Sequence, residues 1–166
     1  SAEVSQELVG MIDDDDVAVR LQLAFSLGEL HPGDRMHELI RLLQNDGEDP
    51  RFRVAIQSSL SAGAADFVGA ILEDDKLLGI DHVRGFLATL ANQIGRSKNE
   101  KDIRNTVAAI DNLAGDDELH NTLVKEIVVA LLADGSGVPA DELSKMSKGR
   151  VRDILSGLLS TARSTA

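Results

Sequence analysis

The chain of 166 residues contains no cysteine, no tryptophan and no tyrosine, and phenylalanine occurs only four times. Without a thiol, the chain excludes disulfide bonds, thiolate catalysis, cysteine-bound zinc and haem attachment through a Cys-x-x-Cys-His segment. Because aromatic side chains are so scarce, the core has to be built from leucine, isoleucine, valine and alanine. Such a core suits close packing of helices on one another.

Long apolar runs and an excess of positive charge are also missing. No stretch approaches the roughly 18 apolar residues of a membrane-spanning helix, so we expect no membrane insertion. Seventeen basic residues face 28 acidic ones, which gives a formal net charge of -11. A field of this sign repels phosphate backbones and anionic lipid, so nucleic acid is not an expected partner. We expect a protein partner or a neighbouring domain of the same chain.

The segment DDDDVAVRLQLAFSLGEL, residues 13–30, looks like a strand when it is read in a line. Every second residue from Val17 to Leu27 is apolar, which is typical of a half-buried strand. On a helical wheel with about 100° per residue, this alternation becomes an apolar arc of about two thirds of the circumference. The segment therefore predicts a helix that is covered on several sides. Its narrow remaining strip consists of Ala18, Gln22, Ser26 and Glu29.

The same pattern recurs about every 33 residues. Arg53 and Leu60 stand 33 residues after Arg20 and Leu27, and further helix starts are expected near residues 81, 117 and 150. Shorter amphipathic segments separate these starts, with loop-forming sequences such as HPGD and DGSGVP between them. We therefore expect one domain over residues 1–166, made of five helix pairs: 1–30, 34–62, 63–97, 100–134 and 139–166.

Helix pairs that cannot bury their apolar faces alone predict an all-α, right-handed α-solenoid. The stretches DDDVAVRLQLAFSLGEL and EDPRFRVAIQSSLSAG resemble HEAT repeats, whose second helix typically opens with Asp, then Val and Arg. The resemblance is good over residues 1–74, fair to residue 97 and weak afterwards. In the weak part His120 replaces the arginine and Arg152 is one place out of register.

A narrower resemblance involves VRLQLAFSLGEL, DPRFRVAIQSSL and FLATLANQIGRSKNEKDI. Together they are similar to the HEAT-like segment of large bacterial multidomain proteins that join a propeller-type dehydrogenase domain to a terminal cytochrome c-like segment. This resemblance implies a non-catalytic scaffold module in a periplasmic or exported parent; otherwise we expect a cytoplasmic protein. The start at Ser1 without Met and the polar end STARSTA are typical of such an excised piece.

Asp16 and Asp49 immediately precede two expected helices, where each carboxylate caps free N–H groups and contributes about 0.3–1 kcal/mol. Arg20, Arg53 and Arg84 lie inside otherwise apolar arcs, where an unpaired charge is costly. The HEAT resemblance implies a ladder in which each arginine bonds an aspartate, such as Asp16 or Asp49, in its own or the adjoining repeat. Bidentate guanidinium bonding suits this role. Arginines that bind a ligand are the alternative interpretation.

Chemistry at the remaining polar residues has little support from spacing. A calcium loop that begins at Asp13 would need Gly and Glu at its sixth and twelfth positions, which hold Ala18 and Ala24. The four histidines show no His-x-x-x-His spacing, and no Gly-x-Ser-x-Gly segment is present. We therefore expect no catalytic residue, no cofactor and no metal. The alternative is a HEAT-like enzyme or cofactor-handling protein, such as a chromophore lyase or a metal-dependent hydroxylase.

Aspartates gather at the turns that lead into the longer helices. Because turns of one type line up in a solenoid, we expect them to form an acidic edge. The edge either docks a basic partner or keeps the protein soluble. A basic cluster at Lys145, Lys148, Arg150 and Arg152 is either a solvated turn or a docking patch. The residues of the acidic edge are Asp13, Asp14, Asp15, Asp46, Asp74, Asp75, Asp116 and Asp117.

Overall fold

The computed structural model describes residues 8, 10–133 and 137–164. Within these ranges the chain forms ten α-helices and two short 3-10 helices, with no β-strand among them. The prediction of an all-α protein is therefore confirmed. None of the described helices combines the length and the apolar character that a membrane crossing requires.

The longer helices begin where the periodicity predicts them. Helices α2, α4, α7 and α11 begin at the expected residues 17, 50, 81 and 150, and α9 begins one residue later than expected. The described elements, in chain order, are η1 (Met11–Asp13), α2 (Val17–Ser26), η2 (Leu27–Glu29), α3 (Pro32–Asp46), α4 (Pro50–Ser59), α5 (Ala64–Leu72), α6 (Asp75–Leu78), α7 (Asp81–Ser97), α8 (Glu100–Asn112), α9 (Glu118–Leu131), α10 (Ala140–Met146) and α11 (Arg150–Ser164).

Two parts of the expected pairing differ from this series. The first helix of the pair 1–30 lies largely outside the described residues, and η1 and α2 represent the rest of that pair. The one-turn helix α6 lies between α5 and α7, where the sequence pattern predicts only a turn. Asp74 starts this helix, because its side chain accepts hydrogen bonds from the main-chain N–H groups of Lys76 and Leu77.

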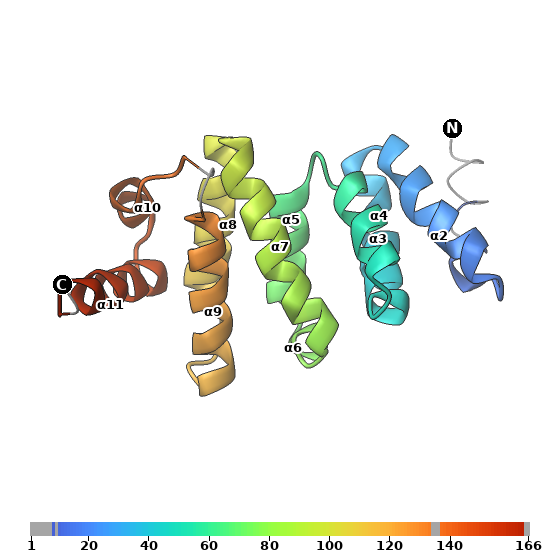
Figure 1. Ribbon diagram of the computed structural model, residues 1–166. Helices are drawn as coiled ribbons and strands as arrows, with labels where there is room; N and C mark the ends of the chain where they lie inside the picture. Colours follow the sequence, from blue (N-terminus) through green and yellow to red (C-terminus); the bar gives the residue numbers. More distant parts are fainter. Residues whose placement is uncertain (1–7, 9, 134–136, 165–166) are drawn as a thin grey trace.

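The helices follow one another across the molecule in chain order, so that the two ends of the chain lie at opposite sides (Figure 1). Helices α2, α4, α7 and α9 form one layer, and α3, α5 and α8 form a second layer behind it. In the first layer α2 packs on α4 and α7 packs on α9, while in the second α5 packs on α8. Each layer therefore buries one side of the other.

The core between these layers is mainly aliphatic, as the composition predicts. Three of the four phenylalanines, Phe52, Phe67 and Phe86, are nevertheless fully buried in it. The rings of Phe67 and Phe86 meet edge to face, with their centroids 6.5 Å apart. This contact joins α5 to α7 within the third pair.

Helix α2 is less enclosed than its sequence predicts. Its buried residues are Leu23 and Ala24, whereas Val17 is 44% exposed and Phe25 is 45% exposed. The expectation of cover on several sides is therefore wrong for the described structure. The reason is its place at one end of the row of helices, where α2 packs mainly on α4 and η1.

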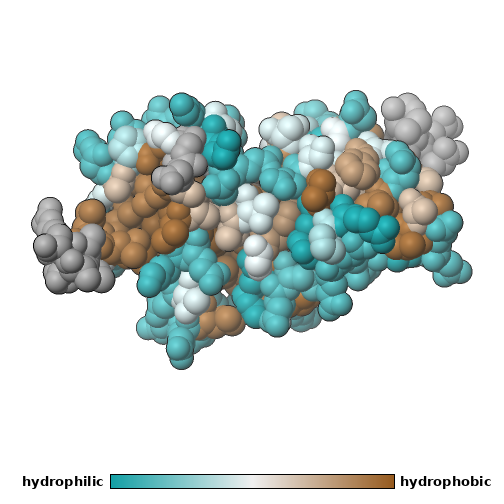
Figure 2. Space-filling view, viewed as in Figure 1, coloured by the Kyte–Doolittle hydropathy of each residue, from teal (hydrophilic) through white to brown (hydrophobic). Residues whose placement is uncertain are grey.

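The last pair departs from the arrangement of the others. Helix α11 runs across the direction of α9 instead of beside it, and the short α10 lies above α11 (Figure 1). Figure 2 shows a broad apolar area on this part of the molecule, over the region of α10 and α11. Half-buried apolar side chains of these elements and the preceding segment include Leu132, Val138, Met146 and Ile154.

Candidate functional site

Aspartates cap three of the longer helices. The side chain of Asp16 accepts a hydrogen bond of 2.8 Å from the N–H of Ala18, and Asp49 accepts one of 2.8 Å from Arg51. The capping roles predicted for these two residues are therefore present. Asp117 caps α9 in the same way, through the N–H of His120 at 3.0 Å.

Two of these caps have altered acidity. The side chain of Arg51, and then its main-chain N–H, lower the pKa of Asp49 below its ordinary value. For Asp117, the main-chain N–H of His120 is the first cause of a lowered pKa and the imidazole of His120 is the second. Each of these interactions favours the ionised carboxylate that accepts the cap hydrogen bond, so their lowered acidity follows from helix capping.

The three ladder arginines share a contact that the sequence did not predict. In each, Nη1 donates to the main-chain carbonyl six residues earlier, in the turn before its helix. Arg20 reaches Asp14 at 2.6 Å, while the other two contacts are Arg53 with Gly47 and Arg84 with Leu78. The guanidinium groups therefore fasten each entry turn to the helix that follows it.

The expected pairing of Arg20 with Asp16 and of Arg53 with Asp49 is wrong. Arg20 instead meets Asp46 of the adjoining turn, through Nε at 3.0 Å and Nη2 at 2.6 Å. The carboxylates of Asp16 and Asp49 turn to their own helix ends. They bond N–H groups there, and in Asp49 also the guanidinium of Arg51.

Arg84 has both kinds of partner. It bonds Asp81, three residues before it on α7, as well as the carbonyl of Leu78. His120, in the arginine position of the fourth repeat, bonds Asp117 through Nδ1 at 2.8 Å. Its ring also lies against Gly115, so it contacts the entry turn as the arginines do.

Arg35 is a structural residue that sequence reasoning missed. Its side chain is 3% exposed and donates to the carbonyls of Gly28, Leu30 at 2.9 Å and Ala62 at 2.7 Å. Burial lowers the pKa of its guanidinium. A signal was available, because Arg35 lies four residues before the buried Leu39 and so on the apolar face of α3.

Asp111 connects the last helix pair to α8. Its carboxylate accepts hydrogen bonds from the hydroxyl of Ser147 at 2.9 Å, from the N–H of Lys148 at 2.7 Å and from the N–H of Val151 at 3.1 Å. Ser147 is fully buried. The start of α11 is thus capped by a residue from another helix.

The histidines occupy separate places. Nε2 of His82 donates to the carbonyls of Leu43 at 3.0 Å and Gln44 at 3.2 Å, so it holds α7 against the end of α3. His31 and His37 are exposed. Across the described residues, no group of three or more histidines and carboxylates is placed to hold a metal ion.

The turns that carry the acidic edge all lie along the lower side of Figure 1, at the beginnings of α2, α4, α6 and α9. Much of their charge takes part in local contacts. Asp13 pairs with Arg41 at 2.7 Å, and Asp46 pairs with Arg20. Asp74 and Asp117 cap helices, and Asp14 accepts from the N–H of Asp16 at 2.8 Å. The remaining edge carboxylates, on Asp15, Asp75 and Asp116, are exposed.

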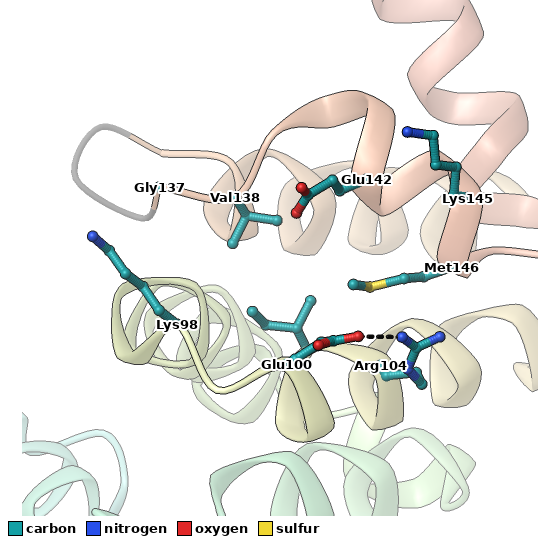
Figure 3. A pocket seen from close by; sticks show the side chains of 9 residues that line it. Lys98, Glu100, Arg104, Gly137, Val138, Glu142, Lys145 and Met146 are labelled. Carbon is teal, nitrogen blue, oxygen red and sulfur yellow. Dashed lines mark hydrogen bonds and ion pairs between the residues drawn. The ribbon is translucent and has the colours of Figure 1, made fainter.

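A hollow of about 500 Å³ lies between α8 and α10. Ile103, Val138 and Met146 give it an apolar lining, and Lys98 and Lys145 stand at its margins. Figure 3 shows the methionine side chain extended between the two helices, above the ion pair of Glu100 with Arg104. A second hollow of about 500 Å³ shares Arg104 and Met146 with the first and continues to Lys148. Together these hollows form the groove, as we call it below.

The described chain is thus an all-helical protein of stacked helix pairs, with structural polar contacts at its turns and a basic-rimmed groove near its C-terminal end. No protein-family model, curated protein or solved structure matches the sequence or fold.

Proposed function

We propose that this chain is a HEAT-like α-solenoid and a non-catalytic protein-interaction or scaffold module. The observation that carries the proposal is the repeated entry turn. Arg20, Arg53 and Arg84, which stand 33 and 31 residues apart, each bond a carbonyl six residues earlier. A unit that recurs in both sequence and hydrogen bonding supports a stack of equivalent repeats.

The distribution of polar side chains supports a binding role in preference to catalysis. Arg35, Asp111 and His82 bond main-chain groups of neighbouring elements. The lowered pKa values of Asp49 and Asp117 are explained by helix capping. What the stack offers to other molecules is extended surface: a layer of exposed helix faces, an acidic edge and the groove. Extended surfaces of this kind are the usual binding sites of repeat proteins.

The narrower resemblance supports a place for this module inside a larger bacterial multidomain protein. In such a parent, the module holds a neighbouring domain or a separate protein while chemistry takes place elsewhere. The edge and the groove have opposite chemistry, so a partner of either surface is recognisable by the charge change that releases it.

The proposal is tested by affinity purification with two sets of variants. One set replaces Asp15, Asp75 and Asp116 by lysine, and the other replaces Lys145 and Lys148 by glutamate. We expect a protein that wild type retains to be lost with one set and kept with the other. The purified partner should then rebind wild type with the same preference. Equal recovery of every protein by wild type and both sets would contradict an interaction role for these surfaces.

A further inference from the structure

The groove exists because α10 is too short to cover the side of α8. Helix α8 has 13 residues and α10 only seven, and α11 then turns away across the molecule. On its other side, α8 is packed along its length by α5. The side of α8 that faces α10 therefore retains two connected hollows of about 500 Å³ each.

The groove has an apolar middle and a charged rim. Ile103 and Met146 face the space between the helices, while the charged ends of Lys98 and Lys145 point away from each other at its margins (Figure 3). Lys148 extends the basic rim into the second hollow. An apolar side chain in the middle, with acidic groups on either side of it, would match this pattern.

Several acidic groups near the groove have protein partners. Glu100 pairs with Arg104, and Asp141 pairs with Lys145 at 3.3 Å between two well-exposed side chains. Asp111 is bound to the N–H groups and hydroxyl at the start of α11. Glu142 is the further carboxylate of the lining. An exposed pair such as that of Lys145 is worth little, about 0–1 kcal/mol, so an acidic ligand can replace Asp141 at small cost.

Charge along the chain also favours an acidic ligand at this end. Residues 1–97 contain 17 acidic and eight basic side chains, so an anion is repelled there. From residue 143 to the end, five basic side chains face the single acidic Asp153. The long-range field therefore steers an acidic ligand to the region of the groove.

We infer that the groove binds an acidic segment of a protein partner, with one or more apolar side chains inserted between α8 and α10. This inference rests on the proposed interaction function and names the chemistry of the partner. The lysines are spread along the rim and do not converge on one point, which suits an extended chain better than a single phosphate. The lining residues include no aromatic side chain for base stacking, which makes nucleic acid a poorer fit.

Binding of synthetic peptides, followed by fluorescence anisotropy at moderate salt, tests the inference on the full chain. The probe is a 12-residue peptide of glutamates with two leucines. Its controls are the same peptide with serine for leucine, the same peptide with lysine for glutamate, and a single-stranded DNA of equal charge. The groove variant is Lys145→Glu with Lys148→Glu. The matched variant is Lys76→Glu with Lys125→Glu, which makes the same charge change at exposed sites on α6 and α9.

We expect the acidic leucine peptide to bind most tightly, and its affinity to fall about tenfold or more in the groove variant. The matched variant should change it by less than about twofold. Equal losses in the two variants, preferred binding of DNA, or no measurable binding below millimolar concentration would overturn the inference. If affinity purification still yields a partner that the edge variants release, only the groove assignment fails and the interaction function stands.

Discussion

Replacing Arg35 by methionine lowers the free energy of unfolding by about 3 kcal/mol or more, because three main-chain carbonyls lose a buried donor. These carbonyls belong to Gly28, Leu30 and Ala62. For a chain of this length, the melting temperature should fall by about 6–12 °C. Thermal unfolding followed by circular dichroism measures the change.

Arg41→Met is the matched control for this prediction. Arg41 lies on the same helix but is only partly buried, and it pairs with the exposed Asp13. Its loss should cost about 0–1 kcal/mol. If both variants melt at the same temperature, Arg35 does not connect the first two helix pairs in the way described.

Replacing Asp111 by alanine should loosen the last helix pair. The change removes the acceptor for Ser147, Lys148 and Val151, and leaves a buried hydroxyl without its partner. We expect a loss of about 2–4 kcal/mol from the cap and the hydroxyl together. Amide hydrogen exchange over residues 140–160 should become faster, while exchange in α4 and α5 stays unchanged.

Two controls separate this effect from a general loss of stability. Asp111→Asn keeps an acceptor oxygen and should preserve most of the protection. Asp66→Ala removes an exposed carboxylate from the first turn of α5 and should leave exchange at 140–160 unchanged. Uniformly faster exchange in Asp111→Ala would contradict a specific role for Asp111 in holding α11.

The positions of the helices were predictable because their signals are local. A cap such as Asp49, followed by Pro50 and an apolar face, fixes a helix start within a few residues of sequence. The spacing of about 33 residues then repeats that information along the chain. The same locality explains the failure at α6, since one turn of helix is too short to have a periodic pattern.

The contacts between helices were less predictable because they depend on packing. Arg20 was expected to bond an aspartate, but its partner Asp46 is 26 residues away and the nearer Asp16 is used as a cap. Asp111 and Ser147 are separated by 36 residues, and no local pattern connects them. The groove depends on the direction of α11, which is a property of packing that the helix pattern does not determine.

The exposed Phe25 shows the same limit from the other direction. The wheel for α2 describes which residues are apolar, but cover on an apolar face requires a neighbouring element. Phe25 is 45% exposed near one end of the row, whereas Phe52 on the next helix of that layer is fully buried. Position in the row, and not hydrophobicity, decides the burial of these two residues.

The stacking of helix pairs into one extended row is the central claim, because the proposed binding surfaces exist only on such a row. Small-angle X-ray scattering of the monomeric chain tests it most directly. A compact globule of 166 residues has a radius of gyration of about 15 Å. We predict a clearly larger radius and an elongated distance distribution. A radius near 15 Å with a symmetric distribution would contradict the extended stack.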